Sequence, residues 1–329
     1  MGKSTVLSGM RPTDRLHLGN LLGALQDWQR LQSQHRCFFM IADWHALTTE
    51  YADPRGLKEN VRQVALDYLA AGLDPQTSTI FIQSAIPGHA ELYLVLSMIV
   101  PTSWLQRNPT YKEQLEEIKD KDLRTYGFLG YPVLQAADIL LYKADLVPVG
   151  ADQLPHLEIC REIARRFNSL YRPVFPEPKA QLTAVPKLPG TDGRKMSKSY
   201  GNAIYLSDSP EVIRKKVMNT LTDPARVRRE DKGHPEVCPV FSFQKIFNAA
   251  TKERIAEECR SAAIGCVDCK SLLYESLLAT LQPIVEKRKE LGSKPGLIKE
   301  ILAEGNSKAA KVAKATMEEV KDAIGLGEP

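Results

Sequence analysis

The stretch Lys195-Met196-Ser197-Lys198-Ser199 carries two lysines and two serines within five residues, shortly after Gly190-Thr191-Asp192-Gly193. The glycines allow this part of the backbone to move. The two ammonium groups suit the negative charge that develops during phosphoryl or nucleotidyl transfer. By itself such a segment is also typical of a solvated basic loop, so its interpretation depends on the rest of the chain.

A second segment, His17-Leu18-Gly19-Asn20, lies about 180 residues earlier. Here a short apolar run at residues 5–8 gives way to helical apolar spacing at residues 18–31. The N–H groups and dipole at a helix start suit an anion. Gly19 lets a nucleotide approach the backbone, and a neutral His17 can donate a hydrogen bond to a phosphate oxygen. Together the two segments predict an ATP site over which the lysine loop closes.

Strand-like and helix-like segments alternate through the first half of the chain. Continuous apolar runs at residues 37–42, 78–82 and 147–149 predict strands that are buried on both faces. Helical patterns follow at residues 54–71, 90–100, 132–141 and 152–168, with Asp53 and Asp152 as the expected N-caps of the first and last. This alternation predicts an α/β fold with a Rossmann-like parallel sheet.

Different patterns follow in the second half. The proline-rich residues 173–189 are predicted to form a loop, and beyond residue 207 only helical patterns remain, at 244–250, 270–290 and 295–323. We therefore expect two domains. The first is a Rossmann-like nucleotide-binding domain over residues 1–204, and the second is a smaller all-helical domain over residues 205–329.

Composition places the chain among ordinary globular proteins. It has 329 residues, of which 43% are apolar and 26% charged. No segment approaches the roughly 18 apolar residues that a membrane span needs, and the first residues lack a signal-peptide pattern. We expect a cytoplasmic protein without a membrane partner. The net charge of +4 does not by itself indicate a nucleic acid, but Arg226, Arg228 and Arg229 form a local basic cluster that is either a solvated surface or a contact with single-stranded RNA.

Four of the six cysteines are close together in the sequence. Cys238, Cys259, Cys266 and Cys269 follow the pattern C-x20-C-x6-C-x2-C. Four thiolates at such spacing can bind zinc or an iron–sulfur cluster, and the spacing alone does not choose between them. The other two, Cys37 and Cys160, fall in apolar patterns and are expected to be core residues.

Further segments extend these patterns. They are Ser8-Gly9-Met10-Arg11-Pro12-Thr13, Ala42-Asp43-Trp44-His45-Ala46, Tyr131-Pro132-Val133-Leu134-Gln135-Ala136-Ala137-Asp138 and Pro148-Val149-Gly150-Ala151-Asp152-Gln153. In order and spacing they resemble the tryptophanyl-tRNA synthetases, and the two ATP segments resemble the signatures of class I aminoacyl-tRNA synthetases. The resemblance covers almost the whole chain. It departs at Asp14-Arg15, where the family commonly has a glycine; aspartate tolerates turns, so only a local change is expected.

The resemblance implies a set of residues that bind ATP. They are Arg11, Pro12, Thr13, Gly19, Asn20, Gly150, Ala151, Asp152, Lys195, Met196, Ser197, Lys198 and Ser199. It also implies that His17, Lys112, Lys195 and Lys198 are catalytic, because they stabilise the triphosphate in the transition state. Mg²⁺ is expected to accompany ATP, with few protein ligands.

Asp138 lies in an otherwise apolar helical stretch, and a buried carboxylate needs a partner. The resemblance implies that this partner is the indole N–H of bound L-tryptophan; a purely structural pairing is the alternative. Tyr131 and Gln135 lie seven and three residues earlier, on the same face of the predicted helix. The resemblance places them near the amino group of the substrate. His45 and Leu7 are further candidates for the walls of this site.

These features predict an enzyme that activates L-tryptophan with ATP and transfers it to tRNA(Trp). The resemblance further implies a homodimer with its interface near residues 90–140, and it favours a [4Fe–4S] cluster over zinc in a helical domain that binds the anticodon. The alternatives are a tyrosyl-tRNA synthetase, a non-catalytic RNA-binding paralogue, and a nucleotidyltransferase that does not use tRNA.

Overall fold

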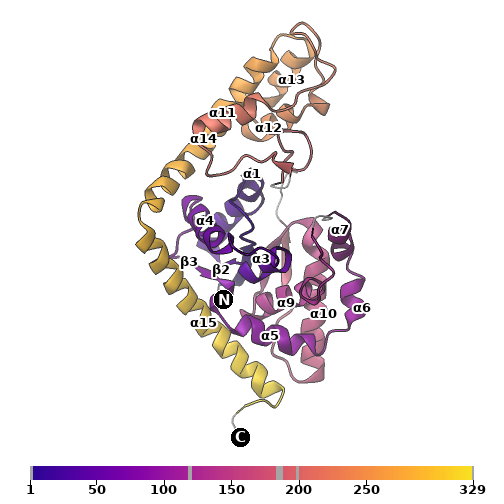
Figure 1. The fold of residues 1–329 in the computed structure, drawn as a ribbon, viewed down its shortest axis with the longest axis vertical. Helices are drawn as coiled ribbons and strands as arrows, with labels where there is room; N and C mark the ends of the chain where they lie inside the picture. The colour runs from indigo at the N-terminus through magenta and orange to yellow at the C-terminus, as the bar shows by residue number, and fades with distance from the viewer. Residues whose placement is uncertain (1–2, 118–120, 183–187, 198–199, 328–329) are drawn as a thin grey trace. The chain divides into compact units, whose positions relative to one another are not determined.

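The computed structural model describes residues 3–117, 121–182, 188–197 and 200–327, whose strands form one parallel sheet (Figure 1). The strands are β1 (Thr5–Met10), β2 (Arg36–Ile41), β3 (Ser78–Ile82), β4 (Leu146–Val149) and β5 (Lys179–Leu182). Their order is β3-β2-β1-β4-β5. The chain therefore runs outward from β1 to β3 and then returns to the other side of β1. In such sheets ligands bind at the carboxyl ends of the strands on either side of this reversal, here β1 and β4.

The predicted strands are confirmed, and one strand was missed. Five of the six residues of β2 are buried, as its continuous apolar run predicts. The sequence assigned residues 173–189 to a loop, which is wrong for Lys179–Leu182, because these residues pair in parallel with β4. This strand lies at the edge of the sheet and is only partly buried, so it lacks the apolar run that marks a central strand.

Most of the helices connect one strand to the next along the chain. They are α2 (Gln26–Gln34), α3 (Asp43–Glu50), α4 (Leu57–Ala70), α5 (Gly88–Ser97), α6 (Thr102–Gln106), α7 (Pro109–Glu117), α8 (Tyr126–Leu129), α9 (Tyr131–Leu141) and α10 (Leu154–Leu170), with 3-10 turns η2 (Gln83–Ala85) and η3 (Ala151–Gln153). Helix α4 begins three residues later than predicted. The Asp53 carboxylate bonds to the guanidinium of Arg55, at 2.6 Å from both Nε and Nη2, and so does not cap the helix.

The first helical region is not one continuous helix. Instead of the uninterrupted helix expected over residues 18–31, a short helix α1 (Leu18–Asn20) leads into a π-helical turn η1 (Leu21–Leu25) and then into α2. π-helical turns are rare in proteins, and those that occur are often found at functional sites.

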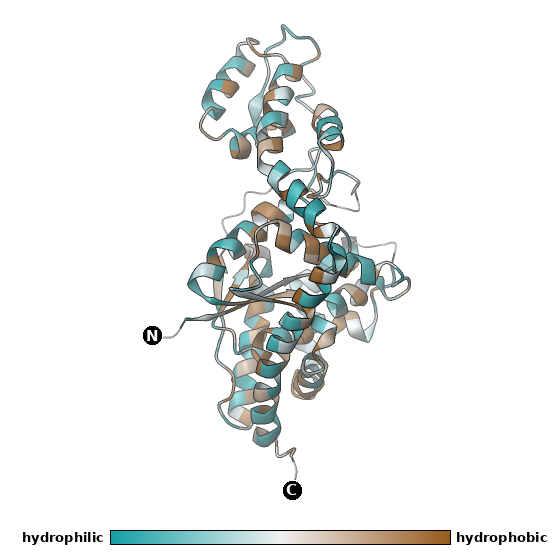
Figure 2. Ribbon diagram, turned by 90° about the vertical axis from the view of Figure 1, so that its left-hand side faces the viewer, coloured by the Kyte–Doolittle hydropathy of each residue, from teal (hydrophilic) through white to brown (hydrophobic). Residues whose placement is uncertain are grey.

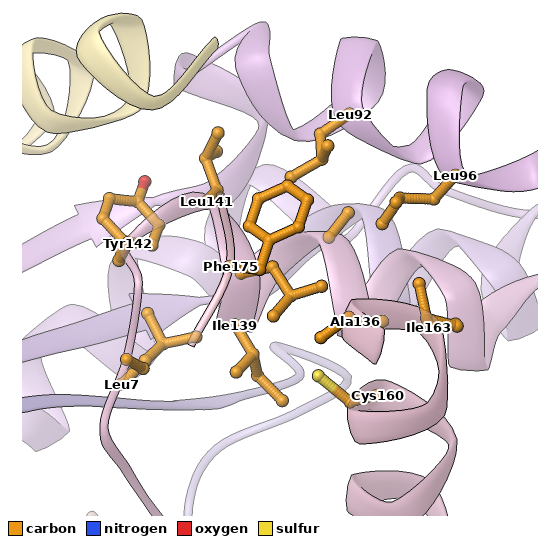
Figure 3. Close-up of a cluster of buried hydrophobic side chains, with 14 of the residues drawn as sticks. Leu7, Leu92, Leu96, Ala136, Ile139, Leu141, Tyr142, Cys160, Ile163 and Phe175 are labelled. Carbon is orange, nitrogen blue, oxygen red and sulfur yellow. The ribbon is translucent and has the colours of Figure 1, made fainter. Parts of the chain in front are cut away.

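Helix α9 is buried in the main hydrophobic core. Figure 3 shows Ala136, Ile139 and Leu141 of this helix packed among side chains from α5, α10 and β1. The core positions predicted for Cys37 and Cys160 are confirmed, since they are 1% and 0% exposed. Because α9 is held on nearly all sides, the polar residues on it have well-defined positions.

Later residues form helices α11 (Pro210–Met218), α12 (Pro239–Phe247), α13 (Lys252–Arg260), α14 (Cys266–Gly292) and α15 (Pro295–Ala323), with a 3-10 turn η5 (Pro235–Val237). Polar and apolar residues are mixed along them (Figure 2). None of the helices within the described ranges is long and apolar enough to cross a membrane.

Contacts divide the chain into two compact units that do not follow the expected boundary at residue 204. The first comprises residues 1–13, 24–184 and 294–329, and the second comprises residues 14–23 and 185–293. Helix α15 belongs to the first unit because it runs along the outer edge of β3 (Figure 1). Asn306 Oδ1 accepts a hydrogen bond from the Ile82 N–H at 2.9 Å, so this helix covers a sheet edge that would otherwise expose backbone groups.

Candidate active site

Two of the predicted ATP segments meet at the reversal in the sheet. Residues 11–13 follow β1, and residues 150–152 follow its neighbour β4. The Thr13 N–H donates to the Arg11 carbonyl oxygen at 2.9 Å, and the Gln153 N–H donates to the Gly150 carbonyl oxygen at 3.0 Å. Both segments are therefore tight turns at the carboxyl ends of adjacent strands, where a nucleotide binds in folds of this kind.

The carboxyl ends of β2 and β3 are joined by side chains. Asp43, directly after β2 and Ala42, accepts hydrogen bonds from the N–H groups of Trp44 at 3.1 Å and Ser84 at 2.9 Å. Gln83, directly after β3, accepts at Oε1 from the N–H groups of Trp44 at 3.1 Å and His45 at 3.3 Å. Gln83 thus satisfies N–H groups at the start of α3 that have no partner within the helix.

Asp138 is 1% exposed and accepts hydrogen bonds from three side chains. Gln83 Nε2 lies 2.8 Å and His89 Nδ1 2.6 Å from Oδ1, while His45 Nε2 lies 2.7 Å from Oδ2. Burial raises the pKa of Asp138, but the charge and hydrogen bonds of His45 and His89 outweigh it, so the pKa lies below its usual range. Asp138 is therefore an ionised carboxylate inside the protein.

Gln83 and His89 are site residues that the sequence analysis missed. Each is fully buried, at 0% exposed. A signal for Gln83 was present, because a polar residue directly after a buried strand stands where ligand-binding groups gather in parallel sheets. No comparable signal marks His89, which reaches Asp138 from a different helix, α5.

Tyr131 and Gln135 lie on α9 with Asp138, as predicted. The Tyr131 hydroxyl lies 2.6 Å from His156 Nε2, and His156 Nδ1 lies 2.9 Å from Gln153 Oε1. Burial raises the pKa of Tyr131, and the nearby Arg11 opposes this effect. Tyr131 is therefore protonated and linked through His156 to the turn that follows β4.

Lys112 is exposed on α7. The preceding residue, Tyr111, packs on Phe128 with ring centroids 5.8 Å apart, and Phe128 packs on Tyr131 at 5.4 Å. This row of rings connects α7 to the first residue of α9. The backbone of α7 beside Lys112 is therefore packed against the start of α9, while the Lys112 side chain is exposed.

His17 caps helix α1. Its Nδ1 accepts from the Gly19 N–H at 3.1 Å, and the Asn20 side chain accepts from the His17 N–H at 3.0 Å. A Cβ on residue 19 would lie 2.9 Å from the His17 ring, so this cap requires glycine. Burial lowers the pKa of His17, against a smaller opposing effect of Asp14. The neutral ring carries its proton on Nε2, which can donate to a phosphate oxygen.

The lysine segment is organised by Asn202, which is 2% exposed. The Asn202 side chain accepts from the Ser197 N–H at 2.8 Å and donates to the Lys195 carbonyl oxygen at 3.1 Å and to Asp192 at 2.7 Å. The Lys195 side chain is exposed, whereas Met196 is buried. The structure therefore presents the Lys195 ammonium group on a loop with a defined backbone. The predicted residues Lys198 and Ser199, and the side chain of Asp152, lie outside the described residues.

The four clustered cysteines line one pocket, together with Arg226. Cys238 is the N-cap of α12 and Cys266 is the first residue of α14, so both lie at helix N-termini. Burial raises the pKa of Cys269 to about 11, so binding a metal there would release protons. Among the described residues, no group of three or more cysteine, histidine or acidic side chains is arranged to hold a single metal ion. The four predicted ligands therefore share one pocket, but the described residues contain no formed metal site.

Arg226 does not belong to a solvated basic surface. It is 8% exposed, whereas Arg228 and Arg229 are exposed. Its guanidinium donates to the Ile264 carbonyl oxygen at 2.7 Å and lies 3.7 Å from Cys259 Sγ, and its buried Nε has no partner within the described part of the chain. A buried cation beside four sulfurs suits an anionic occupant.

The parallel sheet, with ligand-binding turns where its strand order reverses, defines a nucleotide-binding α/β protein. The sequence model described as tRNA synthetases class I (W and Y) matches residues 1–282, and the chain belongs to this family.

Within this family, the chain is similar to proteins that are specific for tryptophan. The chain is 54% identical to a tryptophan–tRNA ligase of Thermotoga maritima, in an alignment that covers 98% of this chain and 99% of the relative. It is 46% identical to a tryptophan–tRNA ligase of Aquifex aeolicus, with the same coverage. Among solved structures, tryptophanyl-tRNA synthetase from Campylobacter jejuni complexed with ADP and tryptophan has a TM-score of 0.87 at 35% identity, covering 98% of this chain and 100% of that one.

Proposed function

We propose that this chain is a tryptophan–tRNA ligase. The carboxylate of L-tryptophan attacks the α-phosphate of ATP, which forms tryptophanyl-adenylate and releases pyrophosphate. The acyl group then passes to a hydroxyl of the terminal ribose of tRNA(Trp), and AMP leaves. The high identity to tryptophan–tRNA ligases over nearly the full chain supports this activity.

The observation that carries the choice of amino acid is the buried, ionised Asp138 and its three donors. Two of these donors occupy Oδ1 and one occupies Oδ2, which leaves one acceptor position for a donor from the substrate, and the indole N–H supplies it. Phenylalanine lacks any such donor and would leave this remaining position on Asp138 empty, which is a basis for rejection. Tyr131 and Gln135, on the same helix, are proposed to approach the amino group of the substrate.

For the ATP substrate, we propose that the turns at residues 11–13 and 150–152, together with Gly19, Asn20 and the lysine segment, hold the nucleotide. His17 would donate from Nε2 to a phosphate oxygen. Lys112, Lys195 and Lys198 would neutralise the charge that develops on the triphosphate during attack. Mg²⁺ bound to the phosphates adds to this neutralisation and needs few ligands from the protein.

For the cysteine pocket, we propose a [4Fe–4S] cluster held by Cys238, Cys259, Cys266 and Cys269. The four cysteines line one pocket, and the cationic side chain of the buried Arg226 offsets the negative charge that a cluster with thiolate ligands carries. A Cβ on Gly233 would lie 2.5 Å from Cys259 Sγ, so glycine is required beside this ligand.

We further propose that the cluster shapes the surface of residues 205–293 that binds the anticodon, with the exposed Arg228 and Arg229 as candidates for RNA contact. Anaerobically purified protein should contain about four irons per chain, and Cys266→Ser should lose them. Iron-free, colourless wild-type protein would contradict the cluster.

The activity is tested by ATP–pyrophosphate exchange with tryptophan, tyrosine and phenylalanine supplied separately. Exchange with tryptophan alone is the expected result. Exchange with tyrosine would make the chain a tyrosyl-tRNA synthetase. No exchange with any of the three, with or without tRNA, would indicate a non-catalytic RNA-binding paralogue.

A further inference from the structure

The two oxygens of Asp138 are not equivalent. Each carboxylate oxygen can accept about two hydrogen bonds. Oδ1 accepts from Gln83 Nε2 at 2.8 Å and from His89 Nδ1 at 2.6 Å, so its capacity is used. Among the described residues, Oδ2 accepts from His45 alone, at 2.7 Å. One acceptor position therefore remains on Asp138, and it lies on Oδ2.

Gln83 is oriented by the start of α3. Its Oε1 accepts from the N–H groups of Trp44 and His45. This assignment leaves the amide nitrogen as the group that faces Asp138, because only the nitrogen can donate. A buried amide with both ends occupied has one orientation, so Gln83 fixes the distance between α3 and the Asp138 carboxylate.

His89 is oriented by Tyr142. The Tyr142 hydroxyl lies 2.9 Å from His89 Nε2, and burial raises the pKa of Tyr142, so the hydroxyl keeps its proton and can donate. His89 Nδ1 faces the Asp138 carboxylate, which has no proton to give, so Nδ1 is the donor in this contact. Figure 3 shows Tyr142 within the hydrophobic core, which holds its ring in place. Contacts at both ring nitrogens therefore hold His89 with Nδ1 directed at Asp138.

We propose that Gln83 and His89 are positioning residues for substrate selection: by occupying Oδ1 with two fixed donors, they orient Asp138 so that Oδ2 presents its remaining lone pair to the indole N–H of tryptophan. This inference rests on the proposed function and extends it, since it assigns the selectivity to two residues that do not touch the substrate. The substrate feature that Asp138 recognises is an N–H donor on an aromatic ring.

The arrangement has a consequence for pH dependence. The titratable groups that face Asp138 are His45 from α3, His89 from α5, Tyr142 at the end of α9 and Cys160 from α10. Of these, only the two histidines donate to the carboxylate. Removing the His89 or Gln83 donor therefore destabilises the ionised form of Asp138, and the pKa of Asp138 rises.

The test compares L-tryptophan with 3-(3-benzothienyl)-L-alanine, in which sulfur replaces the indole N–H. The measured quantities are the ratio of kcat/KM for the two amino acids in ATP–pyrophosphate exchange, and the pH of the acid limb of kcat/KM for tryptophan. His89→Leu removes one donor. Gln83→Glu keeps the acceptor for α3 but replaces the donor with an oxygen. Each variant should lower the ratio by about tenfold to a hundredfold, because a hydrogen bond to a charged group is lost or misdirected. Each should also move the acid limb to higher pH, while KM for ATP stays unchanged.

Three variants serve as controls. His89→Asn places an amide N–H near the position of Nδ1 and should restore most of the ratio. Cys160→Ala alters a buried neighbour of Asp138 that makes no hydrogen bond to it, and should leave the ratio and the acid limb unchanged. Asp138→Asn sets the size of the effect when the carboxylate itself is lost. If His89→Leu does not fold, the test relies on Gln83→Glu, which conserves the side-chain volume.

An unchanged ratio and acid limb in folded His89→Leu or Gln83→Glu would overturn the inference and leave the proposed function standing. Absence of tryptophan-dependent exchange in the wild-type protein would overturn both.

Discussion

At the scale of single residues, the candidate site is defined by which atom of each side chain is already occupied. His17 is an example. Its Nδ1 accepts from the Gly19 N–H, so the neutral ring has only Nε2 left to act on a ligand. The contact between His17 Nδ1 and the Gly19 N–H therefore both caps helix α1 and determines which tautomer the neutral His17 ring adopts.

His17 leads to a prediction about pH. Because burial lowers its pKa below the ordinary value of 6.5, the folded protein keeps His17 neutral at a pH where the unfolded chain already binds a proton. The contribution of His17 to the free energy of unfolding is therefore lost as the pH falls from 6.5 through the folded pKa. His17→Asn, which keeps a side-chain acceptor at the cap, should remove this dependence. Thermal midpoints of both proteins between pH 7.5 and 5 measure it, and identical pH slopes would contradict the prediction.

Asn202 leads to a prediction about the lysine segment. Asn202→Asp keeps the acceptor for the Ser197 N–H but loses the donor to the Lys195 carbonyl oxygen and places a second carboxylate beside Asp192. We expect kcat/KM for ATP to fall by about tenfold or more, since a misplaced catalytic group is costly. KM for tryptophan should change little. Asn219→Asp, at an exposed position at the end of α11, is the control. Equal ATP kinetics in the two variants would show that Asn202 does not position the loop.

The sequence predicted the site residues unevenly, for physical reasons. Arg11 and Gly150 could be placed because they follow strands directly, and the ends of neighbouring parallel strands must meet. Asp138 was marked by its charge within an apolar run. His89 and Gln83 could not be assigned to Asp138 from the sequence, because they lie on other elements and meet it only through packing of the core.

At the scale of secondary-structure elements, helix α15 depends on one small residue. A Cβ on Gly305 would lie 1.8 Å from the Ile80 carbonyl oxygen, so the helix backbone packs directly on strand β3. Gly305→Ala should therefore lower the free energy of unfolding by about 1–3 kcal/mol, the usual cost of overpacking. The measurement is urea denaturation. Gly296→Ala on the same helix, where a Cβ meets nothing within 4 Å, is the matched control. It should be neutral or slightly stabilising. A similar loss in both variants would mean that the α15–β3 contact is looser than described.

The elements themselves were predictable where their apolar pattern is strong. Strand β3 and helix α15 have the predicted bounds, because a continuous apolar run and a long amphipathic repeat are strong signals. Strand β5 was missed because it is a partly buried edge strand. The π-helical turn at Leu21–Leu25 could not be predicted, since apolar spacing does not distinguish one wide turn from an α-helical turn.

At the scale of the whole molecule, helix α5 and its C-cap residue Met98 present apolar side chains to both the core and the solvent. Leu92 and Leu96 are fully buried, whereas Leu94 and Met98 are 57% and 73% exposed. A helix that is apolar on opposite sides has a second surface to cover. Tyr126, 70% exposed, lies in the same stretch of the chain, residues 90–140, to which the proposed dimer interface was assigned.

If this surface forms the homodimer, replacing Leu94 and Met98 together by glutamate should separate the subunits. Each apolar side chain that is buried in an interface contributes about 1.5–3 kcal/mol, and two buried charges without partners add a further cost. The dimer dissociation constant should therefore rise by about a hundredfold or more. Sedimentation equilibrium measures it directly. Val227→Glu changes an apolar residue that is 85% exposed in the second compact unit and should leave the mass unchanged. A wild-type protein that sediments as a monomer, or a double variant that stays dimeric, would remove α5 from the interface and leave its exposed leucine and methionine to another partner.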